Sequence, residues 1–398
     1  MYKVESFKIQ TLNKIASIGL DRFPRDSYEI ASEIPNPDAI VVRSAKMHDI
    51  ELPASLKGIA RAGAGVNNIP IEKCTDKGIV VFNTPGANAN AVKELVIASL
   101  LLSSRKIVQG VEWGKTLIGK GGDVPKLIED GKSAFAGPEI QGKTLGVIGL
   151  GAIGVLVANT AQALGMTVIG YDPYISVESA WGLSHTVIRA SGLETLLRQS
   201  DYISLHTPLT DNTKGFIGKE KLDMLKKGAR ILNFARGGLV NNADLLEALK
   251  SGKVSCYVTD FPDEQLLMND KVINIPHLGA STYESEDNCA MMAVDQLKNY
   301  LENGNIKNSV NFPNCEMERT GGVRLLIANK NIPKMIGQIS AILSEENINI
   351  ANMLNKNREN IAYNIIDIDS DISPSQVEKI KNVEGIIMVR VLSNHQSE

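Results

Sequence analysis

A glycine-rich turn constrains the fold of this chain more than any other feature. Gly149, Gly151 and Gly154 have the spacing G-x-G-x-x-G and follow the apolar run Thr144–Ile148. The next apolar run, TVIGYD, ends in Asp172, 18 residues after Gly154. A strand, a glycine turn, a helix and a second strand that ends in an acidic residue are typical of a dinucleotide-binding βαβ unit. The sequence therefore predicts an open parallel sheet with a dinucleotide at the carboxyl ends of its strands.

The three glycines have separate expected roles. Gly149 permits the tight turn, Gly151 lets the backbone approach a pyrophosphate, and Gly154 allows close packing of helix on strand. The helix N-terminus offers free N–H groups and partial positive charge to the phosphates. Asp172 can accept hydrogen bonds from the ribose hydroxyls and would repel a 2′-phosphate, so the predicted cofactor is NAD rather than NADP.

The regions on either side of this unit have their own patterns. The runs AIVVRS, GIARAG and GIVVFN indicate buried parallel strands before it, and a long helix is expected over residues 88–115. The runs YISLHT, ARILNFA, SCYVTD and KVINIP indicate further strands after it. From residue 323 the order strand, helix, strand, strand, helix, strand indicates a βαββαβ unit, with a capping box at residues 373–376. The predicted fold class is α/β, with two Rossmann-like doubly wound parallel-sheet domains and a C-terminal α+β domain. The predicted domains are residues 1–95 with 286–310 (substrate binding), 96–285 (NAD binding) and 323–398, and residues 114–140 are expected to be an irregular surface excursion.

Composition excludes several classes of function. The chain has 398 residues, 43% of them hydrophobic and 22% charged, as in globular proteins, and its net charge of −3 gives no general reason to bind nucleic acid. No apolar run approaches the ~20 residues of a membrane span. The four cysteines lack metal-ligand spacing, so we expect reduced thiols, a cytoplasmic location and no metal site.

Three polar residues follow predicted strands of the second βα series: Arg236 in NFARGG, Glu264 in TDFPDE and His277 in IPHLGAST. Hydride transfer from a secondary alcohol needs a base for the hydroxyl proton, and the ordinary pKa of histidine suits that task. A neighbouring carboxylate would orient the ring, and an arginine can bind a substrate carboxylate through two hydrogen bonds. These residue types together suffice for the oxidation of a 2-hydroxy acid.

These motifs, with YDPY, LHTPLT and NFARGGLVNNADLLEAL, resemble the D-isomer-specific 2-hydroxyacid dehydrogenases over nearly the whole chain to about residue 310. The resemblance implies that His277 is the acid/base, that Glu264 supports it, and that Arg236 binds the 2-oxo acid. An aspartate near the nicotinamide amide is typical of the family; its position is Thr259 here, and we assign the role to the next residue, Asp260. The implied cofactor-binding residues are Gly149, Gly151, Ala152, Ile153, Gly154, Asp172, His206, Thr207, Pro208, Phe234, Ala235, Arg236, Asp260, His277 and Gly279.

The N-terminal motifs VVRSAKMHD and RAGAGVNNIP resemble the substrate loops of the phosphoglycerate dehydrogenase branch of this family. The resemblance implies a phosphorylated 2-hydroxy acid as substrate, with Lys115 of the W-x-K pair approaching the partner's site in a homodimer or homotetramer. The implied substrate-binding residues are Arg43, Ser44, Gly65, Val66, Asn67, Arg236, His277 and Lys115. Because the two N-terminal motifs lie outside the NAD-binding domain, we expect domain closure to complete the site.

The C-terminal unit resembles an ACT domain, the regulatory module of many such enzymes. The resemblance implies L-serine as an effector, held near Asn329, Asn331 and Asn349. Two other functions stay open at this point. One is a dehydrogenase for an unphosphorylated acid such as glycerate or lactate. The other is an NAD-sensing binding protein of the same fold.

Overall fold

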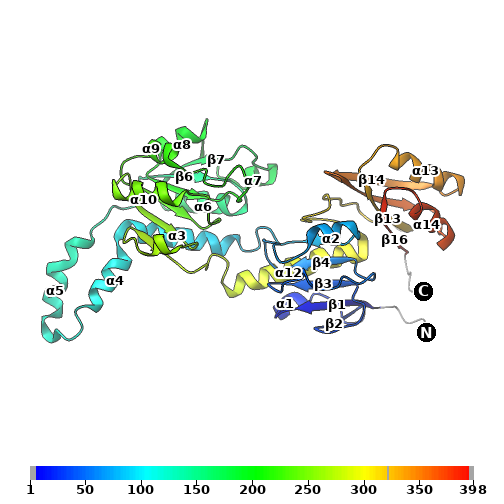
Figure 1. Cartoon of the computed structure of the whole chain (residues 1–398), viewed down its shortest axis with the longest axis horizontal. Coiled ribbons are helices and arrows are strands. Elements are labelled where there is room, and N and C mark those ends of the chain that lie inside the picture. The colour runs from blue at the N-terminus through cyan, green and yellow to red at the C-terminus, as the bar shows by residue number, and fades with distance from the viewer. Residues whose placement is uncertain (1–5, 321, 394–398) are drawn as a thin grey trace. The chain divides into compact units, whose positions relative to one another are not determined.

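The computed structural model describes residues 6–320 and 322–393 and contains two compact units. One unit comprises the residues up to 87 together with those from 286 onward, and the other comprises residues 88–285. The chain therefore passes between the units twice, at 87/88 and at 285/286 (Figure 1). Among the helices of the described ranges, none is both long and apolar enough to cross a membrane.

The unit of residues 88–285 is built on a seven-stranded parallel sheet with the order β12-β11-β10-β9-β6-β7-β8. The chain direction across the sheet reverses between β6 and β9, which makes this the switch point where ligands of such sheets bind. Six of the strands are the predicted apolar runs, and only β8 was not expected. The strands are β6 (Thr144–Ile148), β7 (Thr167–Tyr171), β8 (Ile188–Arg189), β9 (Tyr202–Leu205), β10 (Ala229–Asn233), β11 (Val254–Thr259) and β12 (Val272–Asn274).

Helices cover both faces of this sheet, because alternate residues of its strands are apolar on both sides. One face packs against α3 (Ala89–Arg105) and α6 (Ala152–Ala163). The other packs against α8 (Leu193–Gln199), α9 (Lys219–Met224) and α10 (Asn242–Lys250). Two short helices, α7 (Val177–Gly182) and α11 (Glu264–Leu267), follow β7 and β11.

A helical arm extends from this unit, formed by α4 (Ile107–Lys115) and α5 (Val124–Gly131) with the 3-10 turns Gly121–Asp123 and Lys132–Phe135. The prediction of an irregular segment over 114–140 is therefore wrong. The residues of the arm fold into short helices because glycines at positive φ, Gly119 and Gly121, end one helix before the next begins. Lys106, also at positive φ (46°), separates α3 from α4, so the long helix expected there is broken.

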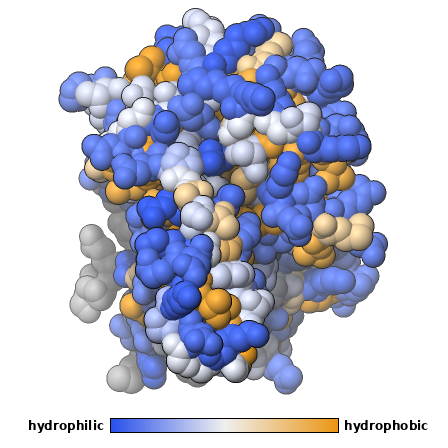
Figure 2. Space-filling view, turned by 90° about the vertical axis from the view of Figure 1, so that its left-hand side faces the viewer, coloured by the Kyte–Doolittle hydropathy of each residue, from blue (hydrophilic) through white to orange (hydrophobic). Residues whose placement is uncertain are grey.

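Several apolar side chains of the arm are exposed, while others pack within it. Trp113 packs within the arm, with its ring centroid 5.2 Å from that of Phe135, and Lys115 pairs with Glu112 at 2.8 Å. Figure 2 shows hydrophobic residues scattered among hydrophilic ones on the side of the molecule where the arm lies. The exposed apolar residues of the arm are Ile107, Val108, Val111, Ile118 and Ile128.

The other unit contains a five-stranded parallel sheet with the order β2-β1-β3-β4-β5. The long helix α12 (Tyr283–Asn303) packs on one face of it, and α2 (Ile71–Asp76) on the other. A Cβ on Gly19 of α1 (Ser17–Leu20) would lie 2.6 Å from Ala290, so only glycine lets α1 pack this closely on α12. The strands are β1 (Phe7–Leu12), β2 (Tyr28–Ala31), β3 (Ala39–Val42), β4 (Gly58–Arg61) and β5 (Val80–Phe82).

The C-terminal domain is the predicted βαββαβ unit, with an antiparallel sheet of order β14-β15-β13-β16. The capping box at Ser373 and Gln376 is present at the start of α14. Helices α13 and α14 cover one sheet face. The elements are β13 (Val323–Lys330), α13 (Met335–Glu345), β14 (Ile350–Arg358), β15 (Ile361–Ile368), α14 (Pro374–Lys381) and β16 (Ile386–Leu392).

The second face of this C-terminal sheet is part of the core of the five-stranded domain. Leu326, Ala328, Tyr363 and Ile365 join the same buried cluster as α12 and the parallel strands. The Tyr363 hydroxyl donates a hydrogen bond to the Gly304 carbonyl at 2.8 Å. The two domains of this unit thus share one hydrophobic core.

A buried ion pair of the C-terminal domain lies where this domain meets the end of α12. Arg324 and Asp367, 0% and 1% exposed, form a bidentate pair, with Nε to Oδ1 at 2.6 Å and Nη2 to Oδ2 at 2.9 Å. The remaining guanidinium N–H groups of Arg324 donate to the carbonyls of Asn303, Met317 and Glu318. All five donors of the guanidinium are therefore satisfied, as a fully buried arginine requires.

Arginines also cap the C-terminal end of α12. Arg390 donates to the carbonyls of Tyr300 and Leu301, and Arg319 donates to that of Glu302. With Arg324 on Asn303, guanidinium groups bind the last four carbonyls of the helix, of which Tyr300 also accepts the Gly304 N–H at 2.9 Å. Their positive charge also complements the negative end of the helix dipole.

Candidate active site

The carboxyl ends of six parallel strands bring the predicted cofactor and catalytic residues to one edge of the seven-stranded sheet. Gly149 follows β6, Asp172 follows β7, and His206 follows β9. On the far side of the switch point, Arg236 follows β10, Asp260 follows β11, and His277 follows β12. The other predicted cofactor-binding residues lie next to these positions in the chain. Ala152 and Ile153 start α6, Thr207 and Pro208 follow His206, Phe234 and Ala235 precede Arg236, and Gly279 follows His277.

The glycine turn has the geometry that its spacing predicts. Gly149 has φ +92°, and a Cβ there would lie 2.7 Å from the His206 carbonyl oxygen. A Cβ on Gly154 would lie 2.0 Å from the Gly149 carbonyl oxygen, so α6 can approach the turn only with glycine here. A Cβ on Gly151 would meet no protein atom within 4 Å. The space at the N-terminus of α6 is therefore open, as a pyrophosphate-binding site requires.

Alanine substitutions in this turn should separate folding from cofactor binding. We expect Gly154→Ala to lower both the melting temperature and NADH affinity, because its Cβ clashes with the backbone. Gly151→Ala should keep the melting temperature and weaken NADH binding, because its Cβ points into the open space. Gly192→Ala, at another helix N-terminus with no atom within 4 Å, is the matched control and should change neither. Unchanged NADH fluorescence titrations for Gly151→Ala would contradict this assignment.

Asp172 is tied to the glycine turn. Its Oδ2 accepts a hydrogen bond from the Leu150 N–H at 2.8 Å, and its Oδ1 accepts one from the Tyr174 N–H at 2.8 Å. Each carboxylate oxygen keeps a second lone pair for a ribose hydroxyl. Asp172 thus combines a role in the turn after β7 with the predicted role at the cofactor ribose.

His206 is held as a neutral ring beside the glycine turn. Burial lowers the pKa of His206 to about 4. Its Nε2 lies 2.8 Å from the Ser204 hydroxyl, and its carbonyl oxygen lies against Gly149. A ring whose pKa lies this far below 7 binds a proton only weakly at neutral pH, so His206 is unsuited to act as the general base. The position supports a role in lining the cofactor site.

Arg236 lies on a turn that is positioned by Asn233, a residue that the sequence analysis missed. The buried Asn233 side chain donates to the Arg236 carbonyl at 2.9 Å and to the Tyr257 hydroxyl at 3.1 Å. Its Oδ1 accepts the Ala235 N–H at 3.2 Å. The guanidinium of Arg236 is exposed and donates to the Ala235 carbonyl, so it is available to an anionic ligand.

Asp260 is the buried carboxylate of the site, and it lies within reach of the charges of Arg236 and His277. It is 2% exposed, and its Oδ2 accepts the Gly279 N–H at 3.2 Å. Burial raises the pKa of Asp260, and the Gly279 hydrogen bond and the charges of His277 and Arg236 oppose this shift. The ring of His277 packs on Phe261 at 4.7 Å and is otherwise exposed.

The structure does not bring the side chain of Glu264 into contact with its predicted partner His277. It is the first residue of α11, and its side chain is exposed. The hydrogen bonds of the described residues do not include one between Glu264 and His277. Catalytic hydrogen bonds are often formed only when ligands bind. The pairing of Glu264 with His277 therefore stays a prediction.

The predicted substrate loops lie in the other unit, after β3 and β4. Arg43 follows β3 and forms an ion pair with Glu286 of α12, Nη2 to Oε1 at 2.6 Å. Its carbonyl accepts hydrogen bonds from Arg61 Nε and Asn68 Nδ2. Ser44 is held by Asn13, whose side chain accepts the Ser44 N–H at 3.0 Å.

Gly65, Val66 and Asn67 form the loop after β4, where the Arg61 guanidinium lies 3.8 Å from the position of a Cβ on Gly65. Arg61 and Glu286 are thus further residues of this region that sequence reasoning did not single out. Lys115 belongs to the arm of the other unit.

The three predicted effector asparagines do not converge within one copy of the chain. Asn329 is buried, and its side chain is hydrogen-bonded to Lys330 and Asn364. The side chain of Asn331 binds the Glu359 carbonyl near one end of the sheet. Asn349 binds Asp369 near the other end, because β13 and β14 run parallel to each other on either side of β15.

Two orphaned polar atoms fit a bound nicotinamide dinucleotide. Among the described residues, eight buried polar side-chain atoms have no hydrogen-bond partner, and two of them, Asp260 Oδ1 and Thr207 Oγ1, belong to the predicted cofactor site. Buried polar groups without partners are rare in native proteins and often mark a ligand site. An amide group of a ligand could donate to Asp260, and the open space at Gly151 could hold phosphates.

Comparisons with known proteins agree with this site. Residues 98–280 match the family model of the D-isomer specific 2-hydroxyacid dehydrogenase, NAD binding domain. A D-3-phosphoglycerate dehydrogenase of Haemophilus influenzae is 30% identical over 406 residues, which cover 98% of this chain and 95% of that relative. The chain belongs to the D-isomer specific 2-hydroxyacid dehydrogenases. The prediction of NAD as the cofactor is confirmed by the family's domain, which coincides with the site described above.

Two further members of this family extend the comparison. A D-3-phosphoglycerate dehydrogenase of Methanocaldococcus jannaschii is 38% identical over 332 residues, and the chain spans 60% of its length. The crystal structure of an NAD+-bound 3-phosphoglycerate dehydrogenase of Entamoeba histolytica is 29% identical. It superposes with a TM-score of 0.59 over 77% of this chain and 99% of that chain.

Proposed function

We propose that the chain catalyses the NAD-dependent oxidation of D-3-phosphoglycerate to 3-phosphohydroxypyruvate, a reaction of serine biosynthesis. The observation that carries the proposal is the gathering of Arg236, Asp260 and His277 next to the glycine turn, at one sheet edge of a family member. The similarity to D-3-phosphoglycerate dehydrogenases over most of the chain supports the choice of substrate.

The residues of the seven-stranded domain divide the chemistry among them. Bound NAD would supply the hydride acceptor for the substrate carbon that bears the hydroxyl. His277 takes the hydroxyl proton, and Glu264 orients the ring during that transfer. Arg236 binds the carboxylate and polarises the adjacent oxygen through charge-assisted hydrogen bonds. Asp260 would help to hold the cofactor, because its orphaned Oδ1 is free to accept a hydrogen bond from the carboxamide.

Arg43 carries the preference for a phosphorylated substrate in this proposal. We expect Arg43→Gln to raise KM for phosphohydroxypyruvate about ten- to a hundredfold and to leave KM for hydroxypyruvate nearly unchanged, since a charged hydrogen bond to the phosphate is lost. Arg25→Gln, an exposed arginine of the same unit, is the control. The measurement is NADH absorbance with each 2-oxo acid.

The same assay separates the two alternative functions. Equal kcat/KM values of the unmodified chain for phosphohydroxypyruvate and hydroxypyruvate would favour a dehydrogenase for an unphosphorylated acid. NADH binding without turnover of any 2-oxo acid would favour an NAD-sensing protein.

The C-terminal domain is proposed to act as an ACT-type regulatory module, with L-serine bound across a subunit interface by Asn331 and Asn349 of different copies. Exposed apolar residues of the arm support a homodimer, in which Lys115 would serve the partner's site, and pairing of C-terminal domains would give a tetramer. The four cysteines are buried free thiols, which supports the proposed cytoplasmic location.

A further inference from the structure

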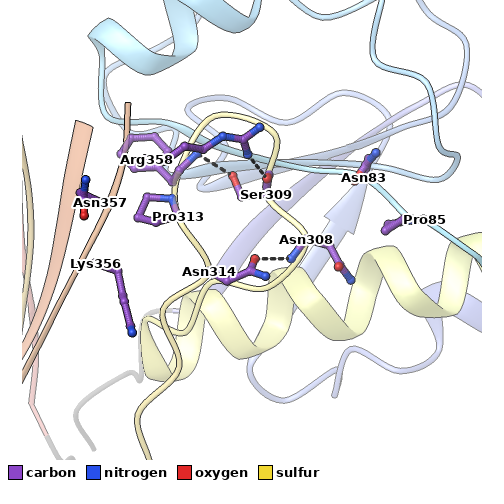
Figure 3. A pocket seen from close by; sticks show the side chains of 10 residues that line it. Asn83, Pro85, Asn308, Ser309, Pro313, Asn314, Lys356, Asn357 and Arg358 are labelled. Atoms are coloured by element: carbon purple, nitrogen blue, oxygen red, sulfur yellow. Dashed lines mark hydrogen bonds between the residues drawn. The ribbon is translucent and has the colours of Figure 1, made fainter. Parts of the chain in front are cut away.

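A polar pocket lies where the C-terminal domain meets the five-stranded domain. Its volume is about 470 Å³. Its walls come from three stretches of chain: the end of β14, the connecting segment around residues 308–314, and the segment after β5 (Figure 3). The lining residues that carry the argument are Lys356, Arg358, Asn83, Asn308, Ser309 and Asn314. All of them belong to one compact unit, and none belongs to the predicted effector or catalytic residues.

Two cations face this pocket, and its lining includes no acidic residue from the part of the chain that the structure describes. Lys356 and Arg358 share one face of β14 because side chains alternate along a strand, and Leu354 on that face packs into the shared core. Figure 3 shows Asn357 on the opposite side of the strand from Arg358, which reaches towards Ser309. The strand thus runs past the core and ends with two positive side chains over the connecting segment.

Both cations remain able to bind an anion. Arg358 donates Nη1 to the Ser309 carbonyl at 2.8 Å, and a neutral carbonyl leaves the charge of the guanidinium uncompensated. Within the described ranges, neither Lys356 nor Arg358 forms a salt bridge with a carboxylate. The amide groups of Asn308 and Asn314 add polar atoms to the same pocket, where the Asn308 N–H donates to Asn314 Oδ1 at 2.9 Å.

A chain of hydrogen bonds connects this pocket to the predicted substrate loop. Asn308 Nδ2 donates to Gln296 Oε1 at 2.6 Å, and Gln296 Nε2 donates to the Asn83 carbonyl at 2.9 Å. The Asn83 side chain then donates to the carbonyl of Ala64 at 2.6 Å, next to Gly65. Asn83 itself lines the pocket and lies four residues before the boundary of the unit at residue 87.

We propose that this pocket binds a small dianionic metabolite, with a phosphate or two carboxylates bound by Lys356 and Arg358 and its polar remainder by the asparagines. Such a ligand would bridge the C-terminal domain to Asn83 and so bias the substrate loop. The binding claim stands independently, and only this effect on the loop rests on the proposed function. The site differs from the proposed serine site in residues and in ligand charge.

The test is calorimetric titration of the full chain with inorganic phosphate and with malonate at constant ionic strength. All titrations use an Arg43→Gln background, because Arg43 is itself proposed to bind phosphate. Into this background we place Lys356→Gln or, as the matched control, Lys381→Gln, which removes an exposed lysine of α14 on the other face of the sheet. Melting temperatures of both variants establish that the chain remains folded.

We expect at least one probe to bind, and Lys356→Gln to raise its Kd about ten- to a hundredfold, while Lys381→Gln leaves it unchanged. Tighter binding of phosphate identifies a phosphoryl head group, and tighter binding of malonate identifies a dicarboxylate. Equal Kd values for the two lysine variants, or no heat from either probe at tens of millimolar, would overturn the proposal.

A second measurement addresses the effect on the substrate loop. In the chain with Arg43 intact, phosphate also competes with the substrate at Arg43, so the coupling is the part of the KM change that Lys356→Gln removes and Lys381→Gln keeps, at unchanged basal kcat. Equal KM changes in the two lysine variants would remove the coupling and leave the binding site. Absence of turnover would refute the proposed function, and the calorimetric result would still decide the pocket.

Discussion

Replacing His277 by alanine is expected to lower kcat for 2-oxo acid reduction by about 10²- to 10⁴-fold, which is the usual contribution of a positioned acid/base. NADH binding should persist, because the cofactor is proposed to be held mainly by the glycine turn and Asp172. The ring of His277 is exposed and packs only on Phe261, so its removal should not unfold the domain.

The matched control is His185→Ala, an exposed histidine that follows α7. It should keep the kcat of the unmodified chain. Stopped-flow NADH absorbance measures turnover, and NADH fluorescence measures binding. Full activity of the His277 variant would refute its assignment as the base, and would direct attention to Asp260, a buried titratable group at the same strand ends.

Replacing Asp367 by alanine is expected to lower the free energy of unfolding by about 3–5 kcal/mol, because it leaves the Arg324 guanidinium buried without a counter-charge. Asp367 also positions the Arg324 guanidinium that binds the Asn303 carbonyl at the end of α12, so the loss should weaken the whole unit. Urea unfolding followed by circular dichroism measures the effect as a shift of the first transition.

Glu378→Ala provides the comparison for this substitution. Glu378 pairs with Lys381 on the exposed side of α14, at 3.4 Å, and exposed pairs of this kind contribute about 1 kcal/mol or less. Equal unfolding midpoints for the Asp367 and Glu378 variants would show that the buried pair does not stabilise the unit. A large shift for Asp367 alone would confirm the role of burial.

The sequence predicted the parts of the fold that depend on local patterns. The strands of the seven-stranded sheet are short apolar runs buried on both faces, so six of the seven were found from sequence. The capping box at Ser373 and Gln376 is also a local signal and was confirmed. The spacing of the glycines predicted the turn before α6, and their contacts agree with the three expected roles.

The parts that were missed depend on contacts between distant residues. Arg324 and Asp367 are 43 residues apart, and nothing near either one indicates that they pair. Glu286 reaches Arg43 across 243 residues, and Asn233 is recognised only through its bonds to the Arg236 turn. The arm was misjudged because its many polar residues and glycines suggested a loop, whereas its helices are short and pack on one another through Trp113 and Phe135.

The arginine caps on α12 bear on how separable the C-terminal domain is. Tyr300, Leu301 and Asn303 of this helix have their carbonyls bound by Arg390 and Arg324, which lie in strands of that domain. A chain truncated before β13 would lose these donors, and would also expose the apolar surface that Leu326 and Tyr363 cover. The C-terminal domain is therefore part of the structure of this unit. A fragment cut at residue 320 should be prone to aggregation. Exchange of this domain between relatives should require exchange of the C-terminal end of α12 as well.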